Sequence, residues 1–225
     1  MTGARLELAG RLAACTGGRL ARHPVSYRVY LASKRALDVV ACLLALPVLL
    51  PLFAIIALAI RFDTPGSALF TQLRTGRDGA RFRMYKFRTM VENAEELKPS
   101  LQHLSIVPWP DFKVIDDPRV TRVGRLLRKT SLDELPQLIN VLRGEMTLVG
   151  PRPTSFTPST YQLWHTKRLD VRPGMTGLWQ VQGRNTTTFD ERLRLDIEYV
   201  ARMSLPLDLR ILRWTVRVVL QRSGA

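Results

Sequence analysis

The residues best suited to chemistry in this sequence are two adjacent carboxylates, Asp133 and Glu134, which follow the cations Arg128 and Lys129. An apolar run with helical spacing comes directly after them. Because a helical turn holds about 3.6 residues, neighbouring side chains point about 100° apart, and the two carboxylates are poorly placed to share one task. One can face a reacting atom while the other holds a metal ion. An ionised aspartate beside a phosphate and a divalent ion is a candidate nucleophile for phosphoryl transfer.

A capping role is the structural alternative for this pair. The segment from Ser131 to Glu134 has the Ser-x-x-Glu spacing of a capping box, in which the glutamate satisfies a backbone N–H. Pro136 weakens this interpretation, because a helix that starts at Ser131 would need an N–H at position 136. A helix that starts at Asp133 avoids the conflict. In either case we expect the pair in the first turn of a helix, where the dipole favours carboxylates and attracts phosphate.

Other distinctive blocks of sequence surround the stretch from Arg128 to Pro153. They are Lys34 to Asp38, Phe70 to Gly79, Tyr85 to Met90, Asp117 to Arg119, Val171 to Gly177, and Gln180 to Asn185. With these blocks in this order, the sequence from Ser33 to Ala225 resembles the bacterial sugar transferases, also called polyprenyl-phosphate glycosyl-1-phosphate transferases or monotopic phosphoglycosyl transferases. The resemblance is to the short form of the family, which has no additional N-terminal membrane region.

The resemblance implies an enzyme, a phosphoglycosyl transferase. Such an enzyme transfers a sugar-1-phosphate from a nucleoside diphosphate sugar, usually a UDP-sugar, to polyprenyl phosphate in the membrane. The products are a polyprenyl-diphosphate-sugar and UMP, in the first membrane step of polysaccharide or glycoconjugate synthesis. We expect two half-reactions through a covalent aspartyl-phosphosugar. We expect Mg²⁺ as cofactor, because both substrates are polyanions and cations are needed to bring them together and to neutralise charge in the transition state.

The resemblance also suggests a role for individual residues. We expect Asp133 to be the nucleophile and Glu134 to bind magnesium. The candidate substrate-binding residues are Arg128, Arg152, Arg184, Asn185, Lys86 and Arg88. Of these, Arg128 and Arg152 are expected to hold phosphates, and Arg184 with Asn185 the nucleotide diphosphate.

Three of these basic residues can also be interpreted from their local sequence. Lys86 and Arg88 alternate with aromatic residues, which would place both cations on one side of a strand, where they either face solvent or contact phosphate. Arg152 lies between two prolines that fix the backbone on both sides of it. A guanidinium restricted in this way suits a bidentate grip on phosphate, although an arginine in a rigid turn is common.

An uncharged run from Val39 to Ile60 is long enough to span a bilayer. Pro47 and Pro51 lie in its middle, and basic residues flank both ends, so the charges give no orientation. The family has a re-entrant helix that enters, breaks and leaves on the same face, and we expect the break at these prolines. Leu50 stands where the family has serine before the second proline, and a kinked spanning helix is the alternative.

The predicted fold class is α+β and mostly helical, in a monotopic membrane protein. Residues 1–32 are expected to form a basic tail, residues 33–62 the re-entrant membrane helix, and residues 63–225 a catalytic domain on the cytoplasmic face of the bacterial inner membrane. Turn residues between short β-favouring runs predict a small β-hairpin near residues 68–87. Two amphipathic helices are expected near the C-terminus, where Arg210, Arg213 and Arg217 align on one face, as in helices that lie in an anionic interface.

The formal net charge of +15 predicts an anionic partner. Membrane lipid and phosphorylated substrates fit this charge. A membrane-tethered nucleic-acid-binding protein is a rival interpretation, but no reading helix or aromatic platform stands out, and we expect no nucleic acid. A scaffold without catalysis is a second rival. The three histidines lack the spacing of a zinc site, and the two cysteines predict no disulfide. The sequence leaves open the sugar, the polymer and the oligomeric state, including a homodimer.

Overall fold

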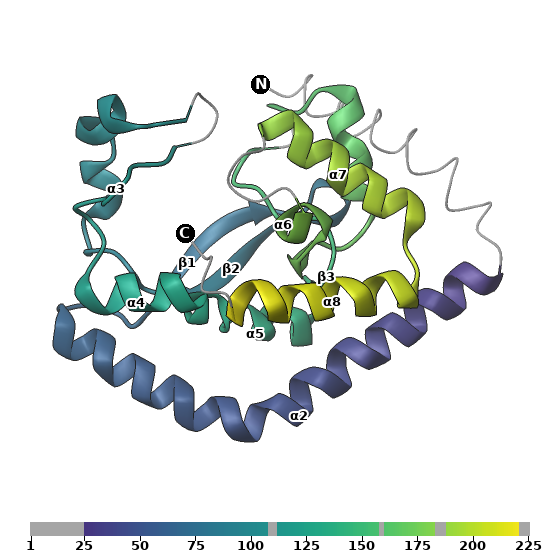
Figure 1. Ribbon diagram of the computed structural model, residues 1–225, viewed down its shortest axis with the longest axis horizontal. Coiled ribbons are helices and arrows are strands. Elements are labelled where there is room, and N and C mark those ends of the chain that lie inside the picture. Colours follow the sequence, from purple (N-terminus) through teal and green to yellow (C-terminus); the bar gives the residue numbers. More distant parts are fainter. Residues whose placement is uncertain (1–24, 108–111, 158–159, 183–187, 221–225) are drawn as a thin grey trace. The chain divides into compact units, whose positions relative to one another are not determined.

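The structure is a computed structural model, and it describes residues 25–107, 112–157, 160–182 and 188–220. In chain order the helices and strands are α2 (Val25–Asp63), β1 (Leu69–Thr75), η1 (Arg77–Gly79), β2 (Arg81–Phe87), α3 (Ala94–Leu97), η2 (Pro99–Leu104), α4 (Arg122–Thr130), η3 (Leu132–Glu134), α5 (Gln137–Arg143), β3 (Thr147–Val149), η5 (Leu163–Asp170), β4 (Gly174–Thr176), α6 (Leu178–Gln182), α7 (Phe189–Arg202) and α8 (Leu205–Leu220) (Figure 1). The predicted class, mostly helical with a small amount of sheet, is confirmed.

Helix α2 is 39 residues long and contains Pro47 and Pro51 (Figure 1). Each proline lacks an N–H, so the carbonyls of residues 43 and 47 receive no ordinary helical hydrogen bond. The predicted break at these prolines and the re-entrant path stay predictions. Within the described part of the chain, α2 is the one helix long and apolar enough to cross a membrane. Large apolar side chains such as Leu44 and Phe62 are 75% and 87% exposed, which is compatible with association with lipid.

The chain divides into two compact units. The first unit contains the described residues of 25–44, 72–84 and 137–215, and the second contains those of 45–71, 85–136 and 216–220. Both α2 and the hairpin of β1 and β2 contribute to each unit. The predicted hairpin is confirmed, since β1 and β2 form a two-stranded sheet.

The core of the second unit joins the end of α2 to β2 and α4. Its buried members are Ile56, Ile60, Phe87 and Leu127, and Phe53 packs edge to face on Phe87 with ring centroids 5.3 Å apart. Polar contacts complete the junction. The carboxylate of Asp63, the last residue of α2, accepts a hydrogen bond of 3.0 Å from the N–H of Val123 in the first turn of α4. The end of α2 and α4 are thus held together by both apolar packing and a hydrogen bond.

Helix α4 lies directly against the segment that follows β2. A Cβ atom on Gly124 would be only 2.1 Å from the carbonyl oxygen of Thr89, so the helix can approach this closely only without a side chain there. The N-cap Thr121 accepts a hydrogen bond of 2.9 Å from the Gly124 N–H through its side chain, and its own N–H bonds to the carbonyl of Thr89. The start of α4 and the backbone of Thr89 are therefore fixed to each other.

The core of the first unit surrounds a parallel pair of short strands, β3 and β4, in which Thr147 is opposite Gly174 and Val149 opposite Thr176. Side chains from α6, α7 and α8 cover this pair, and the buried cluster is Val149, Leu178, Tyr199 and Ile211. Helix α7 begins with a capping box between Thr188 and Glu191. The two predicted C-terminal helices are confirmed as α7 and α8, and the aligned arginines of α8 are exposed.

The start of α2 belongs to the first unit and is held there by buried charge. Lys34 donates to the carboxylate of Asp208 at 2.7 Å and to the hydroxyl of Tyr199 at 3.2 Å. Arg35 donates to the carbonyls at the end of α5, including that of Leu142 at 2.9 Å. These two cations flank the apolar run in the sequence, but in the structure they bind the protein itself. Helix α2 also begins at Val25, inside the range expected for the basic tail.

The contact at Gly124 gives a stability prediction. We expect Gly124→Ala to lower the free energy of unfolding by about 3 kcal/mol, because its Cβ would overlap backbone that cannot move aside as a flexible side chain would. Leu126→Ala, at a 60% exposed position of the same helix, is the control and should change it by no more than about 0.5 kcal/mol. Urea unfolding in detergent measures both. Equal stabilities of the two variants would contradict the close approach.

Candidate active site

The chain turns sharply between α4 and the two carboxylates. Ser131 has a left-handed conformation, with φ 57° and ψ 17°, and its N–H bonds to the carbonyl of Arg128 at 3.1 Å, which ends α4. Its side chain makes no capping hydrogen bond to the following turn. The capping box considered for Ser131 and Glu134 is therefore wrong, because Ser131 closes the preceding helix instead. Asp133 and Glu134 lie in the short 3₁₀ turn η3, and not in the first turn of an α-helix as expected. Pro136 directly precedes α5, where its missing N–H costs nothing.

Asp133 is buried, with 9% of its surface exposed, and Arg128 provides the positive charge near it. Burial lowers the pKa of the Arg128 guanidinium, while the charges of Asp133 and Asp117 raise it. The Nε–H of Arg128 donates a hydrogen bond of 2.9 Å to the hydroxyl of Thr89. A carboxylate removed from bulk water loses much of its hydration, and a fixed guanidinium beside it supplies a counter-charge; both conditions favour a nucleophile.

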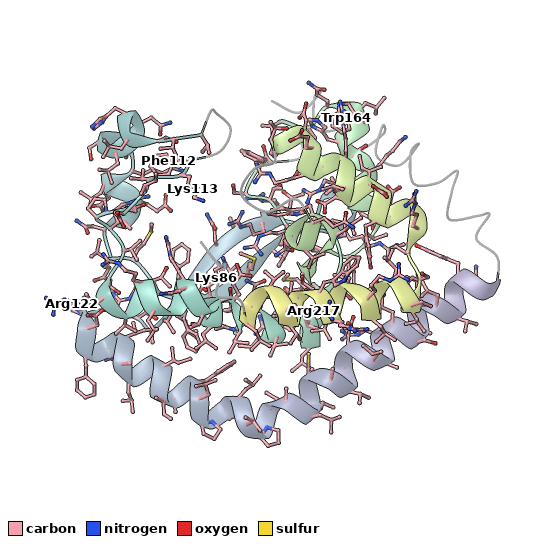
Figure 2. The ribbon with its side chains drawn as sticks, in the orientation of Figure 1. Lys86, Phe112, Lys113, Arg122, Trp164 and Arg217 are labelled. Atoms are coloured by element: carbon pink, nitrogen blue, oxygen red, sulfur yellow. The ribbon has the colours of Figure 1, made fainter. Side chains whose placement is uncertain are left out.

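Glu134 has a different partner. Its Oε1 accepts a hydrogen bond of 3.0 Å from the ammonium of Lys86, which projects from β2 and is labelled in Figure 2. Both side chains are largely but not fully buried, so this ion pair is only partly screened by water. The two carboxylates thus have separate positions and separate cations, in agreement with the prediction that they do not share one task. The structure brings together Asp133, Glu134, Arg128 and Lys86 of the predicted site.

Arg88 lies outside β2, which ends at Phe87. Lys86 and Arg88 therefore do not lie on one side of a strand, contrary to the prediction. Its buried guanidinium donates to the carbonyls of Thr64, at 2.9 Å, and of Pro65, just beyond the end of α2. These bonds satisfy backbone groups at the helix end, where cations are favourable. Arg88 therefore has a structural role, and its contact with substrate stays a prediction.

Arg119 is a second arginine that is engaged in the fold. Arg119 is buried and forms two hydrogen bonds to the carboxylate of Asp117, at 2.9 and 2.6 Å. It lies over the ring of Phe112, which Figure 2 labels, and its hydrogen bonds hold the pKa of Asp117 below its usual range. The charge of Arg119 is thus already paired within the protein.

The predicted turn around Arg152 is built into the first unit. Gly150 has no room for a Cβ, which would lie 2.8 Å from the carbonyl of Arg172. The carbonyl of Arg152 accepts a hydrogen bond from Arg168, which also binds the carboxylate of Asp196 at 2.5 and 3.0 Å. Burial raises the pKa of Asp196 to about 6, although Arg168 acts in the opposite direction. The binding of phosphate by the Arg152 side chain stays a prediction, and Arg184 and Asn185 lie outside the described residues.

The described residues contain no group of three or more histidine, cysteine, aspartate or glutamate side chains that could hold a metal ion. Magnesium, however, is often bound by one or two carboxylates, with phosphate and water oxygens completing its octahedron. The oxygen donors of Asp133 and Glu134 fit that kind of site. Magnesium binding here therefore depends on substrate oxygens and stays a proposal.

Sequence reasoning missed several residues that support this arrangement. Thr89, Asp117 and Asp196 each fix a guanidinium, those of Arg128, Arg119 and Arg168. Only Asp117 carried a signal, since it lies two residues before its partner Arg119 in one of the quoted blocks.

Comparison with known proteins identifies the family. A sequence profile described as bacterial sugar transferase matches residues 29–222. The chain belongs to the bacterial sugar transferase family. Asp133, Glu134, Arg128 and Lys86 all lie within the matched range. This match confirms the resemblance inferred from the sequence blocks.

Several named sugar transferases are similar to this chain. A galactosyl transferase of Streptococcus agalactiae, CpsE, is 42% identical over 198 residues, which are 87% of this chain and 44% of that protein. The undecaprenyl-phosphate galactose phosphotransferase of Salmonella typhimurium is 45% identical over 197 residues, 85% of this chain and 41% of that protein. The exopolysaccharide production protein ExoY of Rhizobium meliloti is 40% identical over 200 residues, 86% of this chain and 88% of that protein. The chain thus spans less than half the length of the first two of these relatives and most of the third.

The buried pair of Arg168 and Asp196 gives a second stability prediction. We expect Asp196→Asn to cost about 3 to 5 kcal/mol of unfolding free energy at pH 8, where Asp196 is ionised, because a buried guanidinium loses its counter-charge. The matched control is Glu198→Gln on the same helix, which breaks only the exposed pair with Arg202 and should cost no more than about 0.5 kcal/mol. Urea unfolding in detergent compares them, and a similar small loss in both variants would refute the structural importance of the buried pair.

Proposed function

We propose that the protein is a phosphoglycosyl transferase that moves a sugar-1-phosphate from a UDP-sugar to polyprenyl phosphate. The observation that carries the proposal is the buried Asp133 beside Arg128, with Glu134 held separately by Lys86. Relatives named as undecaprenyl-phosphate galactose and glucose phosphotransferases support the reaction class. The products are polyprenyl-diphosphate-sugar and UMP, at the start of polysaccharide or glycoconjugate synthesis.

The proposed chemistry has two displacements at the same phosphorus atom. In the first, a carboxylate oxygen of Asp133 attacks the phosphorus that bears the sugar, the bond to the bridging oxygen breaks, and UMP leaves with that oxygen. The product is an aspartyl-phosphosugar on the enzyme. In the second, a phosphate oxygen of the polyprenyl phosphate attacks the same phosphorus, and the bond to Asp133 breaks. The carboxylate is restored, and no net proton or electron is gained by the protein.

The side chains around Asp133 support these displacements through charge and position. Arg128 is positive at every physiological pH and can hold phosphate oxygens in a bidentate way while charge moves between them. Lys86 fixes one oxygen of Glu134, which orients this carboxylate without neutralising Asp133. Magnesium, when bound by Glu134 and phosphate oxygens, would supply further neutralisation of charge on the transferred group. Arg152, Arg184 and Asn185 keep their predicted roles toward phosphate and nucleotide.

We propose that α2 brings this site to the lipid substrate. Its apolar surface is exposed, and its last residue is bonded to the first turn of α4, which leads to the carboxylates. A path that enters and leaves the membrane on the cytoplasmic side would hold Asp133 near the depth of the lipid phosphate. The exposed arginines of α8 suit the anionic headgroups of the inner membrane.

Substitution of the two carboxylates tests the proposed division of roles. We expect Asp133→Asn to reduce UMP release at least about 10³-fold, because the amide is not a nucleophile. Glu134→Gln should also lose activity, and the residual activity should need more magnesium for half-maximal rate. The assay measures UMP release from UDP-galactose or UDP-glucose with polyprenyl phosphate in detergent. Glu198→Gln is the control and should leave UMP release unchanged, since that exposed carboxylate pairs with Arg202 on its own helix. Turnover that survives Asp133→Ala would refute the nucleophile.

Substitution of Pro47 and Pro51 tests the proposed re-entrant path of α2. We expect the double variant Pro47→Ala, Pro51→Ala to favour full crossing of the membrane, because both missing helical hydrogen bonds are restored. A cysteine introduced at Thr2, with Cys15 and Cys42 replaced by serine, reports the location of the N-terminus through an impermeant thiol reagent. With the native prolines it should react only in opened cells, and in the double variant also in intact cells. An unchanged labelling pattern would contradict the re-entrant path.

A further inference from the structure

The hydroxyl of Thr89 contacts the Nε–H of the Arg128 guanidinium and not its terminal nitrogens. The Nε–H of Arg128 donates to Thr89 Oγ1 at 2.9 Å, and Thr89 is 8% exposed. Thr89 comes just after β2, whereas Arg128 lies in the last turn of α4, which begins at the labelled Arg122 in Figure 2. The contact therefore joins two segments that are 39 residues apart in the sequence.

The backbone of Thr89 is unusually well fixed for a residue outside a strand. Its carbonyl accepts a hydrogen bond of 3.1 Å from Thr121, and Met90 forms an antiparallel bridge with Val120. The next N–H, of Val91, donates to the carbonyl of Arg119 at 2.9 Å. The missing side chain of Gly124 allows α4 to press against the same backbone. The Thr89 hydroxyl is carried by this fixed backbone, and its hydrogen bond therefore restricts the position of the Arg128 side chain.

An arginine side chain has many rotamers, and losing them on binding costs free energy unless they are already restricted. A hydrogen bond at Nε fixes the plane of the guanidinium, because Nε, Cζ and both terminal nitrogens are coplanar. The terminal nitrogens take no part in this bond. They carry the donors that match two oxygens of a phosphate.

We infer that Thr89 is a positioning residue that orients Arg128 toward a substrate phosphate. The inference rests on the proposed function, since it assigns the direction of a side chain in that site. Thr89 acts only through Arg128, so its contribution should vanish when Arg128 is absent. A merely structural threonine would affect the protein equally with and without Arg128.

A double-mutant cycle with Thr89→Val and Arg128→Met separates these cases. Valine keeps the shape of threonine without its hydroxyl, and methionine has no hydrogen-bond donor. We expect Thr89→Val to weaken phosphate binding about 10-fold when Arg128 is present and less than about 2-fold with Arg128→Met. Thr89→Ser should restore binding to within about 2-fold of wild type. Thr130→Val, on α4 but with its hydroxyl bonded to carbonyls of that helix, is the control and should not change binding.

The probes are UDP with magnesium and, separately, farnesyl phosphate, with binding measured by calorimetry in detergent. A loss confined to UDP assigns Arg128 to the sugar donor, and a loss confined to farnesyl phosphate assigns it to the lipid acceptor. If Thr89→Val does not fold, Thr89→Cys replaces it, because sulfur accepts hydrogen bonds only weakly. Equal losses with and without Arg128, or full binding by Thr89→Val, would overturn the inference.

The same preparations separate this inference from the proposed function. Wild type that binds the probes but forms no lipid-linked sugar would contradict the proposed function and leave the orientation of Arg128 supported by the cycle. If wild type forms product, but Thr89→Val weakens binding by the same factor with and without Arg128, only the role of Thr89 would be contradicted. Wild type that binds neither probe would overturn both.

Discussion

The close approach of α4 to the backbone of Thr89 is the constraint on which the candidate site depends. It exists because residue 124 is glycine, and any side chain there would overlap a carbonyl. From this contact the end of α4 is determined, and with it the position of Arg128 and the left-handed turn at Ser131. That turn sends the chain into η3, where Asp133 becomes buried. One backbone contact therefore positions both the nucleophile that we propose and the cation beside it.

The positive charge of the chain has two uses. Some cations hold the fold together by binding carbonyls or buried carboxylates, and these are Lys34, Arg35, Arg88, Arg119 and Arg168. Others lie beside the two carboxylates of the site, or are exposed on α8. Buried cations of the first kind are costly unless fully paired, which explains why each has several acceptors. A net charge alone could not distinguish these uses.

The sequence predicted elements whose signals are local. Alternating β-favouring runs identified the hairpin, and apolar residues at helical spacing identified α7 and α8. The pair Asp133 and Glu134 was found because its neighbours resemble a known family. The capping box failed because Ser131 ends α4 in a left-handed conformation and its side chain does not cap the following turn. Contacts such as that between Lys34 and Asp208, 174 residues apart, have no local signal at all.

The central claim is that Asp133 carries the sugar phosphate during the reaction, and the intact mass of the protein tests it most directly. The protein would be incubated with magnesium and UDP-galactose or UDP-glucose, without any lipid acceptor, and then quenched in acid. The account predicts that wild type gains the mass of one hexose phosphate, that polyprenyl phosphate removes it, and that Asp133→Asn never acquires it. Lipid-linked sugar formed by a protein that shows no such gain, or the same gain on Asp133→Asn, would contradict it.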